Sequence, residues 1–214
     1  MMEITQALQR VAEIARRCPT PTLKKAYVAA ARDFCGQSRW LRTDISVTTS
    51  ANDFDYLLAP SDTDLEVIGV RRIVGTTSAG KQFRMDPMDR ELWPLNSRAA
   101  QPRLHAYVPE GQIDLHPTPD AAYTLTVTAQ VQLVLGATTV PDLLDRKWGR
   151  ALTDGALGLL LDIPDQPWTN HGQAMARRKA FQSAINNAKA DEQRGYNQGS
   201  VAVRQRAFIT PRYW

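Results

Sequence analysis

The spacing of apolar residues changes twice along this 214-residue chain, and this change limits the folds that it can adopt. From residue 3 to residue 36, and again from 141 to 195, apolar residues recur at the spacing of a helix that is buried on one side. Between residues 40 and 139 they alternate with polar residues, which indicates β-strands. The sequence therefore predicts an α+β protein: a helical bundle built from N-terminal and C-terminal helix pairs, with an inserted antiparallel β domain.

These changes of period also predict domain boundaries. Residues 1–39 and 140–195 should form the helical bundle, and residues 40–139 the inserted antiparallel β domain. Residues 196–214 should form an extended C-terminal arm. The two ends of the bundle are far apart in sequence, so we expect them to meet in space, with the β part projecting from them.

The N-terminal pair carries clear boundary signals. A first helix is expected from residue 3 to residue 17, ended by Cys18 and Pro19. Thr20 as cap and Pro21 at the first helical position then predict a second helix, which Gly36 closes. The inner stripe of this second helix should contain Leu23, Tyr27, Ala30 and Phe34.

The central part predicts several strands. Residues 45–48 and 54–58 alternate around Asn52-Asp53 and indicate a hairpin. Residues 65–74 form a further strand with Gly69 at a bulge, and 85–92 a short helix or loop. Short strands at 103–108 and 112–115 flank a turn at 109–111. The clearest strand is 123–135, with one apolar and one neutral polar face, typical of a half-buried antiparallel strand.

The C-terminal pair begins at Pro141-Asp142, since proline and an acidic residue both suit a helix N-terminus. Ala151, Gly155 and Gly158 form a strip of very small residues on the first helix, although a glycine inside a helix costs about 1 kcal/mol relative to alanine. The close approach of another element to this strip of the helix must offset this cost. Two alternatives remain: packing against the second helix of the same bundle, or packing against a neighbouring subunit.

The second helix of this pair should begin at Thr169 or Asn170 and end at Gly195. Its inner face should contain Ala174, Phe181, Ile185 and Ala188. Arg177, Arg178 and Lys179 are expected on the outer face with Lys189. Such a basic cluster is usually a solvated helix face, and against DNA it would make salt-sensitive contacts that do not read sequence.

The tail after Gly195 contains no acidic residue but is rich in arginine and apolar residues. The residues that we expect to form a docking arm are Arg204, Arg206, Phe208, Ile209, Arg212, Tyr213 and Trp214. This composition is typical of interface hot spots. The arm could dock on another subunit, or it could fold back on its own domain.

Composition sets further limits. The chain has 26 Lys and Arg against 22 Asp and Glu, a net charge of +4, so proximity to DNA is tolerated but not demanded. No apolar run reaches the roughly 20 residues of a membrane span, and the N-terminus shows no secretory signal. We therefore expect a chain made in the cytoplasm, with Cys18 and Cys35 reduced because they lie too far apart for a disulfide.

Signals for chemistry are weak. The three histidines are not at metal-ligand spacing from one another or from cysteine, so neither a metal nor a cofactor is expected. Asp114 and His116 face the same side of a strand, but they are better explained as a strand end. Residues 75–82 look superficially like a phosphate-binding loop, yet Gln82 replaces the required Ser or Thr, which favours a hairpin loop.

As a whole, the chain resembles the head-to-tail adaptor (connector, head-completion) proteins of tailed bacteriophages. The resemblance rests on order and spacing: residues 22–27, 31–35, 40–41, 54–58, 102–108, 111–119, 140–144, 154–157, 167–168 and 180–189. It implies a structural protein of the virion neck, not an enzyme, and a ring of typically twelve copies below the portal protein. Such a ring extends the DNA channel and offers a platform to the next neck or tail component.

The resemblance also suggests roles for particular residues. It implies that the arm reaches the portal, and it gives Ala151, Gly155 and Gly158 a possible place between subunits of the ring. The alternative is a DNA- or RNA-binding accessory protein that uses Arg177, Arg178, Lys179 and the arginines of the tail. The scarcity of aromatic residues among the basic ones outside the tail counts against that alternative.

Overall fold

The computed structural model describes residues 2–93 and 98–195, and these form an α+β fold. The helices are α1 (Ile4–Ala12), α2 (Thr20–Ser38), α3 (Asp142–Leu160) and α4 (His171–Gln193), with a short 3-10 helix η1 (Arg90–Leu92). The strands are β1 (Met2–Glu3), β2 (Arg42–Thr48), β3 (Asp55–Leu57), β4 (Leu65–Thr76), β5 (Gln82–Pro87), β6 (Leu104–Val108), β7 (Gln112–His116), β8 (Thr124–Leu133) and β9 (Thr139–Val140). The predicted arm, residues 196–214, lies outside the described residues.

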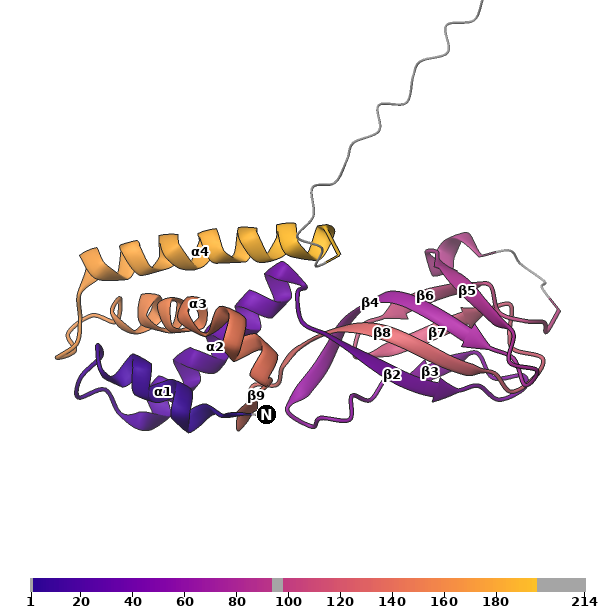
Figure 1. Ribbon diagram of the computed structural model, residues 1–214, viewed down its shortest axis with the longest axis horizontal. Coiled ribbons are helices and arrows are strands. Elements are labelled where there is room, and N and C mark those ends of the chain that lie inside the picture. The colour runs from indigo at the N-terminus through magenta and orange to yellow at the C-terminus, as the bar shows by residue number, and fades with distance from the viewer. Residues whose placement is uncertain (1, 94–97, 196–214) are drawn as a thin grey trace, which may run out of the picture.

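The two helix pairs meet as one bundle, as the sequence predicted. Helix α2 packs against both α3 and α4, and α1 packs against α2 and α3. Figure 1 shows the helices together at one end of an elongated molecule and the sheet at the other. The short strands β1 and β9 pair antiparallel and bring the start of the chain beside the start of α3. The division of the chain at residues 40 and 140 stays a prediction.

Helix boundaries differ from the sequence prediction in the first pair. Helix α1 ends at Ala12, five residues before the predicted end, and Arg17 adopts a positive φ of 68° in the turns that follow. Pro19, not Thr20, is the N-cap of α2, because Thr20 and Pro21 already occupy its first turn. In the second pair, Asn170 caps α4 by accepting a hydrogen bond from the Gln173 backbone N–H at 3.0 Å.

The sheet is mixed, so the prediction of a purely antiparallel β domain was wrong. Its order is β2-β8-β4-β5-β6-β7-β3, and β5 pairs parallel with β6 through Asp86 and Pro87. The parallel pair arises because Arg84 to Pro87 continue the chain as a strand, where the sequence predicted a short helix or loop from residue 85. All other pairs in this sheet are antiparallel.

The predicted hairpin of residues 45–48 and 54–58 was also wrong. Strands β2 and β3 lie at opposite edges of the sheet. β2 pairs with β8 over seven residues, whereas β3 pairs with β7 over three. The longer pairing places Ile45 against the buried face of β8, which a local hairpin would not achieve. The connection between β2 and β3 is held by the Tyr56 hydroxyl, which donates to the Asp53 carbonyl at 2.9 Å.

Other local predictions are confirmed. The register of β4 against β8 shifts between Val67 and Gly69, where a bulge was expected, and again between Val70 and Arg72. β6 and β7 form a hairpin whose turn contains Glu110 and Gly111 at positive φ. The loop at residues 77–81 joins β4 to β5 as a hairpin. Cys18 and Cys35 are free thiols.

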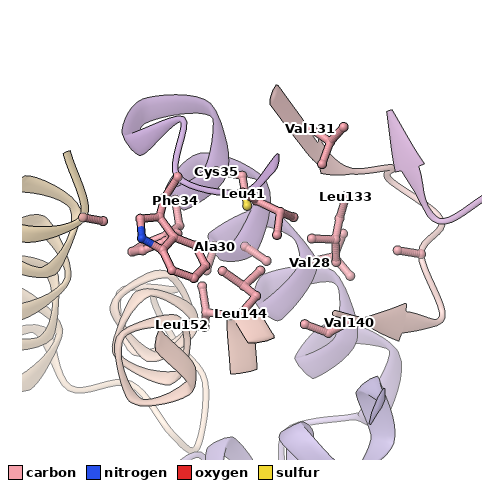
Figure 2. Close-up of a cluster of buried hydrophobic side chains, with 14 of the residues drawn as sticks. Val28, Ala30, Phe34, Cys35, Leu41, Val131, Leu133, Val140, Leu144 and Leu152 are labelled. Carbon is pink, nitrogen blue, oxygen red and sulfur yellow. The ribbon is translucent and has the colours of Figure 1, made fainter. Parts of the chain in front are cut away.

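A single hydrophobic cluster runs from the sheet into the bundle. On β8 the predicted apolar face is buried from Leu125 to Leu133, and its last residues, Val131 and Leu133, reach the helices. Leu135, predicted on the same face, lies after the strand and is 80% exposed. Figure 2 shows Leu133 beside Val28 of α2, with Val131 and with Leu144 of α3 in the same cluster. The strand β8 therefore belongs to both halves of the molecule, and we call this contact the β8–α2 junction. Among the described residues, no helix is long and apolar enough to cross a membrane.

Replacing Leu144 by alanine should lower the free energy of unfolding by about 2–5 kcal/mol, since Leu144 is 0% exposed within this cluster. The adjacent Leu143 is 63% exposed, so Leu143→Ala should change it by less than about 0.5 kcal/mol. Urea denaturation of both variants measures the difference. Equal losses would contradict the burial pattern described for α3.

Candidate functional site

The small residues of α3 allow α4 to approach closely. A Cβ atom on Gly155 would lie 2.8 Å from Phe181 Cε2 and 3.0 Å from Ala30 Cβ. A Cβ on Gly158 would lie 2.8 Å from Arg178 Cγ. Both glycines are thus explained by packing within one bundle, the first of the two alternatives. Ala151 is buried beside a pocket of about 330 Å³ between α3 and α4. A role for the strip between subunits stays a prediction.

The basic residues of α4 do not all face solvent. Arg177 is half-buried and donates to the buried carboxylate of Asp154 on α3. Arg178 Nη2 lies 2.6 Å from Asp162 Oδ2, and its Nε donates to the Gly158 carbonyl at 3.1 Å. Lys179 is exposed and makes no ion pair within residues 2–93 and 98–195. Two of the three cations predicted near DNA therefore hold α4 against α3.

Asp162 also contacts His171 at the start of α4. His171 Nδ1 lies 2.9 Å from Asp162 Oδ1. Hydrogen bonds from His171 and Arg178 hold the pKa of this exposed carboxyl below its usual value. The carboxylate therefore remains charged at neutral pH and closes the connection between the two helices.

The candidate acid–base pair is structural. Asp114 is 0% exposed, and its Oδ2 lies 2.9 Å from Arg90 Nη1. The His116 ring packs on Trp93, with the ring centroids 5.0 Å apart. A carboxylate paired with arginine and a histidine stacked on indole do not form the aligned pair that general acid–base catalysis requires. Among the described residues, no group of three potential metal ligands is gathered.

His105 is a buried titratable group that the sequence did not single out. It lies on β6 beside a pocket of about 590 Å³ that Tyr107 and Arg90 also line. Its side chain is buried, and no hydrogen-bond partner for Nδ1 is present among the described residues. Burial lowers the pKa of His105 to about 4, although the charge of Asp86 opposes the shift. It is therefore neutral at pH 7.

Polar contacts surround the β8–α2 junction, and we call those made by Arg32, Glu192 and Asp64 the three junction clamps. Arg32 of α2 donates to the Leu133 carbonyl at 2.5 Å and pairs with Glu66 of β4 at 2.9 Å. Glu192 of α4 pairs with Arg42 of β2. Each of these joins a helix to the sheet.

The third junction clamp is Asp64, in the loop before β4. Its carboxylate accepts hydrogen bonds from the backbone N–H groups of Thr138 and Thr139 at 3.0 and 2.8 Å and from both hydroxyls. Burial disfavours its charged form, but these four bonds together outweigh burial and hold the pKa of Asp64 below its usual value. It ties the sheet to the segment that leads into α3.

One sequence signal could have found the Glu192 clamp. Acidic residues are unfavourable in the last turn of a helix, where the dipole is negative. Glu192 occupies that turn of α4, is 8% exposed, and also lies 3.6 Å from Arg71 Nε. An acid in such a position indicates an external cation partner, which only the fold could identify.

Arg204, Arg206, Phe208, Ile209, Arg212, Tyr213 and Trp214 all lie outside the described residues. Helix α4 ends at Gln193, beside the Glu192 clamp, so the end of the described chain is fixed against the sheet.

The described residues form two helix pairs and a mixed sheet, and the candidate groups for chemistry among them are not arranged as an aligned catalytic pair. The model of the SU10 adaptor protein family matches residues 2–205, nearly the whole chain. The protein belongs to this family of phage head-to-tail adaptor proteins, and the family indicates no catalytic activity. Adaptors bind other proteins of the virion. A comparison with curated proteins finds no match.

Gly155→Ala should destabilise the protein by about 1–3 kcal/mol, because the added methyl group overlaps Phe181 and Ala30. This loss outweighs the gain in helix propensity of about 1 kcal/mol. In Gly172→Ala the new Cβ meets nothing closer than 3.8 Å, so stability should rise by up to about 1 kcal/mol. Thermal unfolding of both variants tests this, and stabilisation by Gly155→Ala would refute the close approach.

Acidification should destabilise the protein through His105. Unfolded histidine binds a proton near pH 6.5, whereas folded His105 binds one only near pH 4, so the free energy of unfolding falls between these values. The loss should reach up to about 3 kcal/mol. His105→Leu should show a smaller fall over this window in urea titrations from pH 7 to pH 4. Parallel profiles for the two proteins would show that His105 does not titrate in this way.

Proposed function

We propose that this protein is a head-to-tail adaptor that forms a ring of twelve copies below the portal of a tailed phage. The ring extends the DNA channel and presents a platform to the next neck or tail protein, which places the protein in the virion neck. The observation that carries the proposal is the family match over residues 2–205, which includes both helix pairs and the sheet.

The bundle supports a role in assembly. In its core Phe181 packs on Gly155, and nearer the surface the ion pairs of Arg177 and Arg178 join α4 to Asp154 and Asp162. A subunit braced in this way can transmit force between neighbours without changing shape. Ala151, beside its shallow pocket, is the proposed contact between adjacent bundles of the ring, and Gly155 and Gly158 contribute by letting α4 lie close to α3.

The arm is proposed as the portal-binding element. Residues 196–205 are included in the family match, so this segment belongs to the adaptor pattern. Its arginines and terminal Tyr213-Trp214 offer the residue types that dominate interface energy. The clamp at Glu192 fixes the root of the arm to the sheet. The exposed β surface is then available for the next neck component.

The alternative of a DNA-binding accessory protein acting through α4 loses support from the ion pairs of Arg177 and Arg178. A cation that already contacts a carboxylate must give up that contact before it can bind a phosphate. Only Lys179 of the three is without an ion pair in the described part of the chain.

Deleting residues 196–214 should leave a folded protein that no longer attaches to portal rings. The expected loss is at least tenfold in binding, because the arm supplies the aromatic and arginine anchors. Cosedimentation with purified portal rings measures attachment, and circular dichroism checks folding. The matched control replaces Arg98 and Arg103 of the β domain by glutamine and should bind normally. Unfolding of the truncated chain would show that the arm packs on its own domain.

A further inference from the structure

The exposed face of the sheet combines hydroxyl groups with arginines. On strands β2, β8 and β4 the outward residues include Ser46, Thr48, Thr76, Thr124, Thr126 and Thr128. Arg72 is the register partner of Thr128, and Arg84 of β5 is the partner of Val74. Since side chains alternate along a strand, these two arginines share the face with the hydroxyls. We call it the hydroxyl–arginine face.

A β-bulge adds a further arginine to this face. Val70 pairs with Ala129 and Arg72 with Thr128, so Arg71 is the extra residue between them. A bulge lets two consecutive side chains leave a strand on the same side, which regular alternation forbids. Arg71 and Arg72 accordingly line one groove of about 530 Å³, together with Arg42, Arg84 and Thr128.

The charges in this groove are only partly balanced. Glu192 lies within ion-pairing distance of both Arg42 and Arg71. Asp44, on the same face, accepts a hydrogen bond from Thr128 at 2.7 Å. Asp86 is two residues from Arg84 on β5 and so also shares this face. No carboxylate of the described residues forms an ion pair with Arg72 or Arg84. These two guanidinium groups remain available to an external anion.

We infer that the hydroxyl–arginine face binds the phosphate backbone of a nucleic acid without reading its sequence. Arginine and Ser/Thr hydroxyls are the groups that proteins use for such contacts. At a protein interface, arginines instead lie beside aromatic and large apolar residues. The exposed residues of that type within the sheet region are Leu57 on β3, Phe54 in the loop before it, Leu92 on η1 and Leu135 in the loop after β8, and none of them lines this groove.

The test is titration of a short fluorescein-labelled DNA duplex with the full chain, followed by anisotropy at several salt concentrations. The variant Arg72→Gln/Arg84→Gln should bind at least about tenfold more weakly, and its slope of log K against log salt should be smaller by about 2. The matched control, Arg146→Gln/Lys179→Gln, removes two exposed charges from α3 and α4. It should bind within about twofold of the unaltered protein, because its cations lie outside the groove.

Three outcomes would overturn the inference. Equal losses in both double variants would mean that overall charge governs binding. A loss in the control alone would assign DNA contact to the helices. Tighter binding of a polyglutamate peptide than of DNA with the same charge would make the groove a docking site for an acidic protein segment. Binding by the single chain does not rest on the proposed adaptor function, and Arg72→Gln/Arg84→Gln should still attach to portal rings, so the two can fail separately.

Discussion

Burial of the end of β8 between the sheet and the helices is the interaction on which the rest of the structure depends. Val131 and Leu133 complete the apolar face of a central strand, and Leu133 at the same time fills the space beside Val28 of α2. Each half would expose this surface to water without the other, and the hydrophobic effect therefore opposes their separation. The sheet lies between α2 and α3 in the sequence, so the chain leaves the bundle after α2 and returns to it before α3. The contact at the end of β8 holds the sheet against the bundle between these two points.

Hydrophobic contact alone does not fix an angle, because it has no direction. The junction clamps supply that direction, since hydrogen bonds and ion pairs weaken quickly with misalignment. Arg32, Asp64 and Glu192 act on different sides of the junction, and each joins a different pair of elements. Their carboxylates and guanidinium groups are partly buried, so losing one partner leaves an uncompensated charge. This cost favours one orientation of the sheet relative to the bundle.

The sequence predicted what depends on local periodicity and missed what depends on distant partners. The stripes of α2 and α4 and the alternation of β8 each identify a buried face from neighbouring residues alone, and these faces were predicted. β2 and β3 each carry the same alternation, but nothing local states that β2 must pair with β8. The strand at Phe83 and Met85 was too short to stand out before Pro87. Likewise, the sequence around Arg177 predicts a solvated cation, and only the fold brings Asp154 of α3 into contact with it.

The arginines fall into two groups that the sequence could not distinguish. Arg177 and Arg178 of α4 contact carboxylates of the same bundle and hold it together. On the sheet, the bulge at Arg71 turns an extra cation toward Arg72, and Glu192 reaches only one side of the resulting groove. A bulge costs ladder hydrogen bonds and is retained where it redirects a side chain. The bulge in β4 thus gathers arginines on the sheet, whereas ion pairs neutralise Arg177 and Arg178 in the bundle. This difference separates a surface for binding from the surfaces that hold the fold.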